Sequence, residues 1–319
     1  MISPFSQILG HKAQTDYLAR VLENGNTAHA YCFSGPEHVG KTLVAERFLS
    51  PMLGDAGGSL HSQAEVSEVR RPMDPKTGER KNTIPAESIR ELRDRLQMSS
   101  FSTARKIAII YEADCMTTTA QNALLKILEE PVGDTIIVLL ASQPDRLLPT
   151  ILSRVVHLSF LLVPREDICA ELRKTMDAEL AHTIAGLASG RPGTAFVLAG
   201  KDAREAKLEE LRDTLAFLSG TLTDRFRETE SLQKDREDRD CLTRVLANAR
   251  QVLHDCLLVS ASCEHLLAAS VFDGEVHTLA AKKSAGEWAK ILTVLGNVER
   301  AIQNNGNIGV SLEEFALSL

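Results

Sequence analysis

Apolar residues in the first half of the chain fall into short continuous runs, separated by stripes at helical spacing. The runs predict four buried strands, at 31–33, 106–111, 135–140 and 155–158. The stripes predict helices at 41–49, 85–96 and 118–130, with a helical turn at 147–152. Strands that alternate with helices are typical of a parallel sheet covered on both faces. We therefore expect an α/β domain in this half.

Two regions depart from the alternation. Residues 50–83 are rich in glycine, serine, proline and charge, which predicts an irregular insertion. After Pro164 the pattern is helical, and a charged stretch at 201–236 carries leucine and phenylalanine at helical intervals. Helices are expected at 165–176, 178–187, 194–199, 240–269, 286–304 and 311–319, the last with Ser311 as its N-cap. The fold class expected is therefore α/β plus all-α.

The segment between the first strand and the first helix has the phosphate-binding pattern G-x-x-x-x-G-K-[ST]. Its residues are Gly35, Pro36, Glu37, His38, Val39, Gly40, Lys41 and Thr42. In this pattern the glycines let backbone N–H groups wrap the phosphates, the lysine reaches the terminal phosphates, and the threonine hydroxyl binds magnesium. Thr42 is thus the candidate Mg²⁺ ligand. The position between a strand and a helix supports the match, because a helix N-terminus favours an anion. The sequence predicts a P-loop that binds ATP with Mg²⁺.

Hydrolysis of a bound nucleotide also needs carboxylates, which the sequence supplies poorly. In P-loop enzymes an acid at the end of the strand expected beside the loop holds magnesium, and another group orients the attacking water. Tyr111 stands at the first position, and a phenol with a pKa of about 10 does not replace a carboxylate at neutral pH. Glu112 is the candidate for the water-orienting role. Asp114 is a backup acid, for which we favour a loop or helix-cap role. We expect the chain's own ATPase activity to be weak or absent.

Composition and charge narrow the class of protein. Hydrophobic residues make up 44% and charged residues 25% of the 319, as in ordinary globular proteins. The net charge of −7 argues against a stand-alone DNA-binding protein, which normally carries a basic surface. The six cysteines include no C-x-x-C pair and the histidines are dispersed, so we expect no metal site built from them and no zinc. The sequence shows neither a transmembrane stretch nor a secretory signal, which favours a cytoplasmic protein.

Four segments read FSQILG at 5–10, HAY at 29–31, AQNALLKILEEP at 120–131 and LPTILSR at 148–154. Together they resemble the AAA+ subunits of bacterial DNA polymerase III clamp loaders. The resemblance is strong over residues 5–160, moderate over 163–200 and weak beyond. It implies three domains: a nucleotide-binding AAA+ domain at 1–162, a helical lid at 163–204, and a helical collar at 205–319 that forms a ring with sister subunits.

The resemblance also implies a role for Arg154. In the family, the arginine of a Ser-Arg-Cys motif points into the ATP site of the neighbouring subunit as an arginine finger. Ser153 and Arg154 match this motif, and Val155 replaces the cysteine, which leaves the arginine available. Without this context, an exposed arginine is usually a solvated surface charge.

Departures from the family pattern bear on the type of subunit. Residues 50–100 contain no cysteine, so the zinc module that the family often carries is not expected. Gly193 stands where ATP-hydrolysing gamma/tau subunits have a phosphate-sensing arginine, and Tyr111 replaces the usual magnesium-binding Asp. These two losses beside an intact finger favour the delta-prime type, a stator-like subunit. The partners implied are gamma/tau and delta subunits in a hetero-oligomeric ring, with the sliding clamp and primed DNA reached through the complex.

Two alternatives stay open at this point. Glu112 and the complete P-loop are compatible with a gamma/tau-like subunit that hydrolyses ATP itself. The other alternative is a scaffold of AAA+ origin that binds no nucleotide, because a P-loop can keep its shape after losing its ligand.

Overall fold

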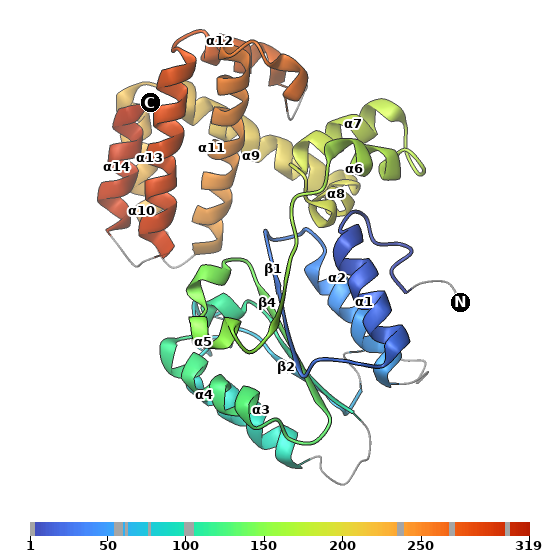
Figure 1. The fold of residues 1–319 in the computed structure, drawn as a ribbon. Coiled ribbons are helices and arrows are strands. Elements are labelled where there is room, and N and C mark those ends of the chain that lie inside the picture. Colours follow the sequence, from blue (N-terminus) through green and yellow to red (C-terminus); the bar gives the residue numbers. More distant parts are fainter. Residues whose placement is uncertain are drawn as a thin grey trace. The chain divides into compact units, whose positions relative to one another are not determined.

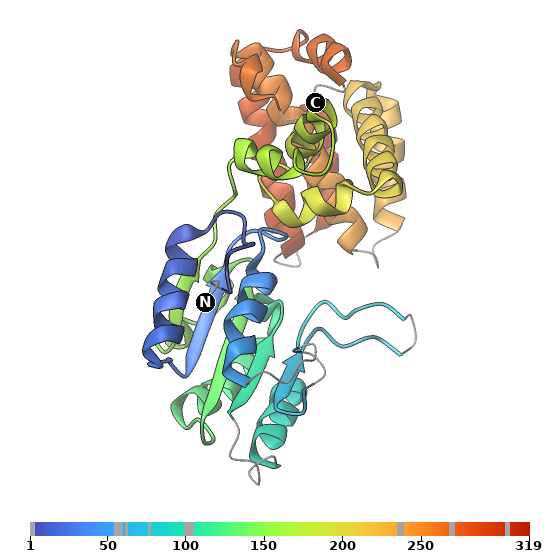
Figure 2. The same ribbon diagram turned by 90° about the vertical axis from the view of Figure 1, so that its right-hand side faces the viewer.

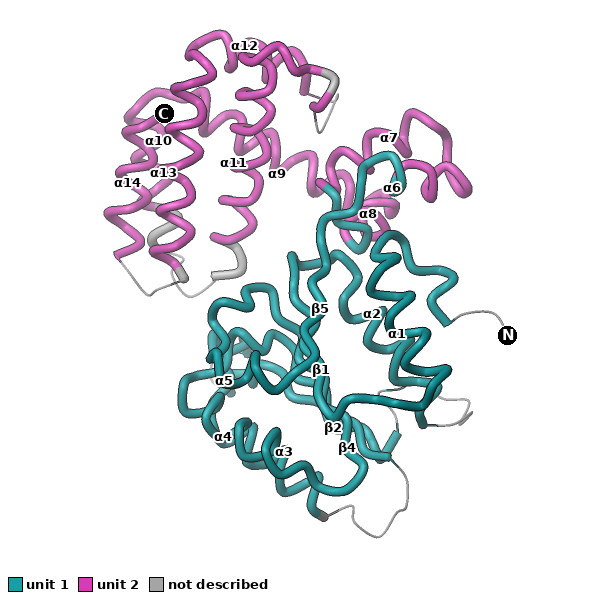
Figure 3. Tube along the Cα trace, viewed as in Figure 1, with its two compact units in different colours: residues 1–168, 190–193 teal, residues 169–189, 194–319 magenta. Residues whose placement is uncertain are grey.

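The chain divides into two compact units (Figure 3). Unit 1 comprises residues 1–168 and 190–193, and unit 2 comprises residues 169–189 and 194–319. The computed structural model describes residues 4–53, 60, 63–75, 78–98, 105–234, 239–267, 272–303 and 307–319. The finer division into three domains, with boundaries after residues 162 and 204, stays a prediction.

Unit 1 is built on a parallel sheet of five strands. The strands are β1 (Ala30–Ser34), β2 (Val66–Val69), β3 (Lys106–Ile110), β4 (Thr135–Ala141) and β5 (Val156–Ser159). Their spatial order is β2-β3-β4-β1-β5, and every neighbouring pair runs parallel (Figure 1). The three central strands are buried along their whole length, which explains their continuous apolar runs. The predicted α/β class is therefore confirmed for this unit.

Helices cover both faces of this sheet (Figures 1 and 2). They are α1 (Lys12–Asn24) and α2 (Lys41–Leu49) on one face, and α3 (Ala86–Met98) and α4 (Thr118–Glu129) on the other. Along β3, Ile107 and Ile109 pack on the α1–α2 side, whereas Ala108 and Ile110 pack on the α3–α4 side. Because alternate side chains of a strand point to opposite faces, the next residue, Tyr111, falls on the face of α2.

The structure corrects the sequence analysis of unit 1 in three places. α1 was not predicted. The insertion at 50–83 contains a short 3₁₀ helix, η1 (Ser50–Leu53), and strand β2, although 54–59, 61–62 and 76–77 lie outside the described residues. After β2 the chain leaves the sheet edge as an arm, in which Met73 and Arg80 pair as an antiparallel bridge (Figure 2). Finally, β4 lies between β1 and β3, so the strand before Tyr111 is not beside the P-loop strand.

Unit 2 consists of helices in its described part, as predicted. α6 (Arg165–Leu172) begins in unit 1 and ends in unit 2. α8 (Pro192–Leu198) likewise begins in unit 1 and ends in unit 2. The other helices are α7 (Ala178–Leu187), α9 (Lys201–Ser219), α10 (Leu222–Lys234), α11 (Arg239–Ser260), α12 (Asp273–Ala280), α13 (Ala285–Gln303) and α14 (Ile308–Ser318). α11 packs against α9, α12 and α13, and α14 packs against α10 and α13. The buried indole of Trp288, on α13, donates to the carbonyl of Ala280 at 3.2 Å.

Three helix boundaries differ from the expected ones. The charged stretch at 201–236 is two helices, broken at Gly220, and the Thr221 hydroxyl caps the second by accepting from the N–H of Asp224. α11 ends at Ser260, and α12 is a separate helix. The last helix is capped by Asn307, which accepts from the N–H of Val310, so Ser311 lies inside the helix and is not its N-cap.

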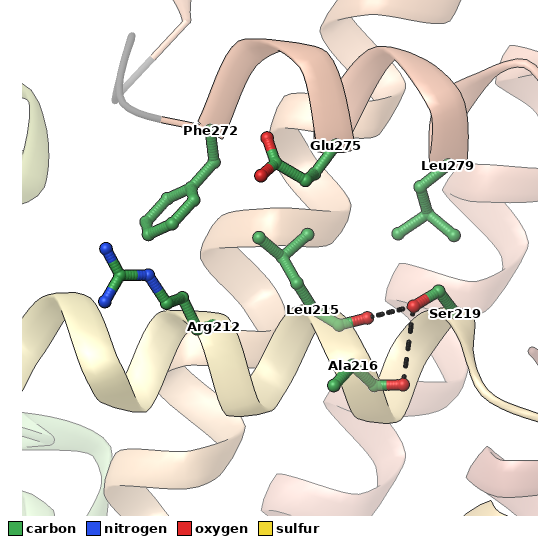
Figure 4. A pocket seen from close by; sticks show the side chains of 7 residues that line it. All are labelled: Arg212, Leu215, Ala216, Ser219, Phe272, Glu275 and Leu279. Carbon is green, nitrogen blue, oxygen red and sulfur yellow. Dashed lines mark hydrogen bonds between the residues drawn. The ribbon is translucent and has the colours of Figure 1, made fainter.

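A hollow of about 250 Å³ lies between α9 and α12 (Figure 4). Its walls include Leu215, Phe272 and Leu279, with Arg212 and Glu275 as the charged members. None of these residues belongs to a motif of the sequence. Among all helices of the described residues, none combines the length and apolar character needed to cross a bilayer.

Candidate nucleotide-binding site

The P-loop connects β1 to α2 in a conformation that depends on its glycines. Gly35 has φ 143° and Gly40 has φ 109°, while His38, between them, has φ 60°. A Cβ atom on Gly35 would lie 2.0 Å from the carbonyl oxygen of Phe160, so no side chain fits there. Within the described chain, the backbone N–H groups of residues 37–42 donate to no protein acceptor, which leaves them available to a phosphate.

Lys41 is the first residue of α2 and its ammonium group faces the loop. Only 8% of the residue is exposed, and Nζ donates to the carbonyl oxygens of Gly35 at 2.5 Å and Pro36 at 2.7 Å. Burial lowers the pKa of Lys41, while the carboxylates of Glu37 and Asp114 act in the opposite direction. Thr42 follows as an exposed residue in the first turn of α2. Lys41 therefore lies against the loop, and Thr42 lies in the first turn of the helix that follows it.

Two segments outside the motif also contact the P-loop. His11 Nε2 donates to the carbonyl oxygen of Val39 at 2.9 Å, and burial lowers the pKa of this imidazole. Residues 190–193 approach from the other segment of unit 1, where the N–H of Gly193 donates to the carbonyl oxygen of His38 at 2.8 Å. Burial lowers the pKa of the Arg191 guanidinium, and Glu37 of the loop raises it. Gly193 was expected at this site from the sequence, whereas His11 and Arg191 were not.

The side chain of Tyr111 contacts β2. Its hydroxyl donates to Glu68 Oε1 at 3.2 Å, and β2 lies on the far side of β3 from β4 and β1. The guanidinium carbon of Arg70 stands 3.4 Å from the centroid of the phenol ring. Burial raises the pKa of Tyr111, so the phenol stays neutral at physiological pH.

The two remaining candidate acids, Glu112 and Asp114, form hydrogen bonds with other groups of the chain. Glu112 receives two hydrogen bonds from Arg71, at 2.8 Å and 3.0 Å, and has φ 49° at the start of the short helix η3 (Ala113–Cys115). Asp114 is buried and accepts from the N–H groups of Ser142 and Gln143, at 3.0 Å and 3.2 Å. The loop role favoured for Asp114 agrees with these contacts. Neither Arg70 nor Arg71 was predicted from the sequence as part of this site, because only the fold brings the chain after β2 beside the end of β3.

Arg154 lies at the opposite end of the sheet from Tyr111 and Glu112. It follows α5 (Pro149–Leu152) and precedes the amino end of β5, whereas Tyr111 follows the carboxyl end of β3. Arg154 Nη2 pairs with Glu129 Oε1 at 2.8 Å, and Nη1 donates to the carbonyl oxygen of Thr150 at 3.1 Å. The side chains of Arg154 and Glu129 are 38% and 50% exposed, so the pair is a surface ion pair.

A polar cleft of about 210 Å³ lies between α3 and α4. Arg90, Arg93 and Lys126 contribute three cations to its walls, and Thr119 and Asn122 contribute polar side chains. Arg90 also pairs with Glu87, and Arg93 with Asp94, but these acids lie outside the cleft lining. The cleft was not predicted, because its cations come from two helices that are distant in the sequence.

The sheet order and the P-loop after β1 give unit 1 the fold of an AAA+ P-loop domain. The family model described as "DNA polymerase III, delta subunit" matches residues 10–163. A gamma/tau subunit of Mycobacterium tuberculosis is 33% identical over 183 residues, covering 55% of this chain and 32% of that protein. The delta' subunit of Pseudomonas aeruginosa is 31% identical over 195 residues, covering 57% and 59%, and that of Escherichia coli is 34% identical over 142 residues, covering 43% and 41%. Over residues 10–163, the chain is therefore similar to the subunits of DNA polymerase III clamp loaders.

The matches leave the type of subunit open, because gamma/tau and delta' proteins are both among the relatives. The matched segment spans 32% of the length of the Mycobacterium tuberculosis gamma/tau subunit and 59% of that of the Pseudomonas aeruginosa delta' subunit. A gamma subunit-related protein of Thermotoga maritima overlays with a TM-score of 0.44 and 21% identity, covering 94% of this chain and 97% of that one.

Proposed function

We propose that the chain is a delta-prime-like, stator-type subunit that supports ATP-dependent loading of the sliding clamp by a DNA polymerase III clamp loader. Arg154 completes the ATP site of a neighbouring subunit in trans, and the chain's own P-loop binds ATP as a structural ligand with little or no hydrolysis. The observation that carries the proposal is the combination of Tyr111 at the acid position with an accessible arginine at the other end of the sheet.

The contacts of Arg154 are compatible with a role in trans. A surface ion pair such as Arg154–Glu129 contributes about 0.2–1 kcal/mol, so the guanidinium leaves its own chain at small cost. A γ-phosphate in a neighbouring site offers a stronger, charge-assisted partner. Glu129 therefore holds the arginine near the surface in the isolated chain without committing it.

The proposal is tested in the reconstituted complex with three variants of this ion pair. Arg154→Ala and Arg154→Lys should lower the ATPase rate of the complex while leaving its assembly intact, because lysine lacks the planar fork of donors. Arginine fingers contribute about 10³–10⁵ to turnover in related P-loop enzymes, so the loss should be large at the site concerned. Glu129→Gln breaks the same pair but keeps the arginine, and should leave the rate unchanged. An unaltered rate with Arg154→Ala would remove the basis for the trans role.

The gamma/tau-like alternative predicts turnover by the purified chain. The hydrogen bonds from Arg71 to Glu112 argue against it, since this carboxylate is already engaged. A steady-state ATPase assay separates the two: turnover that Lys41→Ala abolishes would favour the alternative. Nucleotide retained by the purified chain would exclude the third possibility, a scaffold without nucleotide.

The cleft between α3 and α4 supports a direct contact with nucleic acid. Cations near 90, 93 and 126 present a local positive surface on a chain whose net charge is −7. Phosphates of a nucleic acid backbone are the ligands that such a surface attracts without regard to sequence. We therefore propose that Lys126 and its neighbours contact the DNA backbone in the assembled complex.

A further inference from the structure

In P-loop ATPases an acid at the end of the strand that corresponds to β3 holds magnesium, and here the corner formed by the carboxyl ends of β2 and β3 contains two arginines. Arg70 and Arg71 come directly after β2, and Tyr111 and Glu112 come directly after β3. The N–H of Tyr111 donates to the carbonyl oxygen of Val69, so the two segments run side by side. α2, which carries the P-loop lysine, borders the same corner, since Tyr111 belongs to the same buried cluster as Val44 and Phe48 of α2.

The oxygen ligands in this corner do not fit Mg²⁺. Magnesium takes near-octahedral oxygen ligands and is held in such sites by one or two carboxylates. The carboxylate of Glu112 already receives two charge-assisted hydrogen bonds from Arg71, whose side chain is only 13% exposed. The carboxylate of Glu68 receives hydrogen bonds from Arg70 and from the phenol of Tyr111. A divalent cation would have to displace a guanidinium from Glu68 or Glu112 and then remain close to that positively charged group.

Arg70 keeps hydrogen-bonding capacity for a ligand. Its Nε and Nη2 both donate to a single oxygen of Glu68, at 3.3 Å, and its Nη1 has no acceptor among the described residues. The guanidinium is stacked on the ring of Tyr111 and its side chain is 40% exposed. Stacking on an aromatic face fixes the plane of the guanidinium and leaves its edge free to donate. Such an edge is suited to a phosphate.

We propose that Arg70 takes the place of Mg²⁺ in this site, so that the chain binds nucleoside triphosphate without a divalent cation. Arg71 keeps Glu112 from acting as a metal ligand, and Tyr111 serves as the platform on which Arg70 is stacked. This inference rests on the proposed binding of nucleotide by the P-loop. It does not depend on the proposed role of Arg154, which the ATPase rate of the complex tests separately.

The experiment is a nucleotide titration of the full purified chain by calorimetry, with ATP in excess Mg²⁺ and with ATP in EDTA. The expected dissociation constants agree within about twofold, because no metal contributes to the contact. Arg70→Ala should weaken binding about tenfold or more in both buffers, the size of one charge-assisted hydrogen bond. Arg80→Ala is the matched control, since Arg80 is an exposed arginine on the same arm. Circular dichroism melting of each variant establishes that it is folded.

A gain-of-function variant makes the test independent of loss of binding. Tyr111→Asp with Arg71→Ala supplies a carboxylate at the acid position and releases Glu112, so binding by the double variant should become stronger in Mg²⁺ than in EDTA. Wild-type binding that falls tenfold or more in EDTA would overturn the inference. Equal affinity of Arg70→Ala and wild type would also overturn it. If wild type binds no ATP in either buffer, both the inference and nucleotide binding by the P-loop fail, while the Arg154 result stands on its own.

Discussion

Gln121 offers the sharpest test of how α4 supports the segment that presents Arg154. The side chain is 4% exposed and makes three hydrogen bonds to the backbone. Its Nε2 donates to the carbonyl oxygens of Met116 and Arg146, at 3.2 Å and 3.0 Å, and its Oε1 accepts from the N–H of Leu148 at 2.7 Å. Gln121→Leu keeps a similar volume and leaves these three backbone groups without a partner. The last of them lies directly before α5.

Each lost hydrogen bond is worth roughly 1 kcal/mol, and more where the abandoned group stays buried, so the substitution should destabilise unit 1 by about 3 kcal/mol. With a urea dependence of about 2 kcal/mol per molar for a unit of this size, the midpoint should fall by about 1.5 M. Asn122→Leu, on the exposed side of the same helix, is the matched control and should change stability by no more than about 0.5 kcal/mol.

The chain contains its own optical probes for this assay. All three tyrosines, Tyr17, Tyr31 and Tyr111, belong to unit 1, and the single tryptophan, Trp288, belongs to unit 2. Tyrosine near-ultraviolet circular dichroism therefore follows unit 1 during urea unfolding, and tryptophan fluorescence follows unit 2. The Gln121 variant should move the first transition and leave the second in place. A midpoint shift below about 0.5 M in the tyrosine signal would refute the assignment of three stabilising hydrogen bonds to Gln121.

Three further outcomes are expected. Gly35→Ala should abolish nucleotide binding and lower the melting temperature, because its Cβ would overlap the carbonyl of Phe160; a variant that still binds ATP would contradict this. Lys126→Ala should weaken DNA binding by the complex and reduce the slope of log affinity against log salt by about 1, and an unchanged slope would place DNA elsewhere. The pKa of His277 is raised, first by its hydrogen bond to the carbonyl of Asp273 and then by Glu264, so its stabilising effect is complete below its unfolded pKa of about 6.5 and is lost as pH rises through the higher folded value. Tryptophan-monitored unfolding should thus show a larger decline in stability above pH 6.5 for wild type than for His277→Gln, and parallel profiles would show that the imidazole is not linked to folding.

Most of the correct predictions from the sequence rest on local patterns of residues. The P-loop is a contiguous motif, and its strand and helix flank it directly, so its place at the end of β1 follows from residues 30–49 alone. The position of Tyr111 follows from the alternation in β3, because a strand buried on both faces fixes which side chain emerges on the face of α2. α1 could have been found too: Leu18, Val21 and Leu22 form a stripe that ends at Gly25, whose φ of 64° caps the helix.

The misses share a physical cause, which is that they depend on contacts between distant segments. β2 reads Val-Ser-Glu-Val, a run too short and too polar to predict as a strand before its pairing with β3 is known. The position of β4 between β1 and β3 is a property of the topology, and periodicity along one strand carries no information about its neighbours. Arg70 and Arg71 read as ordinary insertion charges until the sheet sets them against Tyr111 and Glu112.

The parallel arrangement of the sheet has an evolutionary consequence. Tyr111 emerges where β3 ends, and Arg154 stands where β5 is about to begin, so the two lie on opposite rims of the same sheet. A codon change on one rim meets no packing constraint from the other. Under the role proposed for Arg154, substitutions where β3 ends can accumulate by drift while selection on a neighbouring subunit's ATP site preserves the rim where β5 begins. Duplicated subunits of one ancestral ring can diverge in this way into members that hydrolyse ATP and members that only support hydrolysis by others.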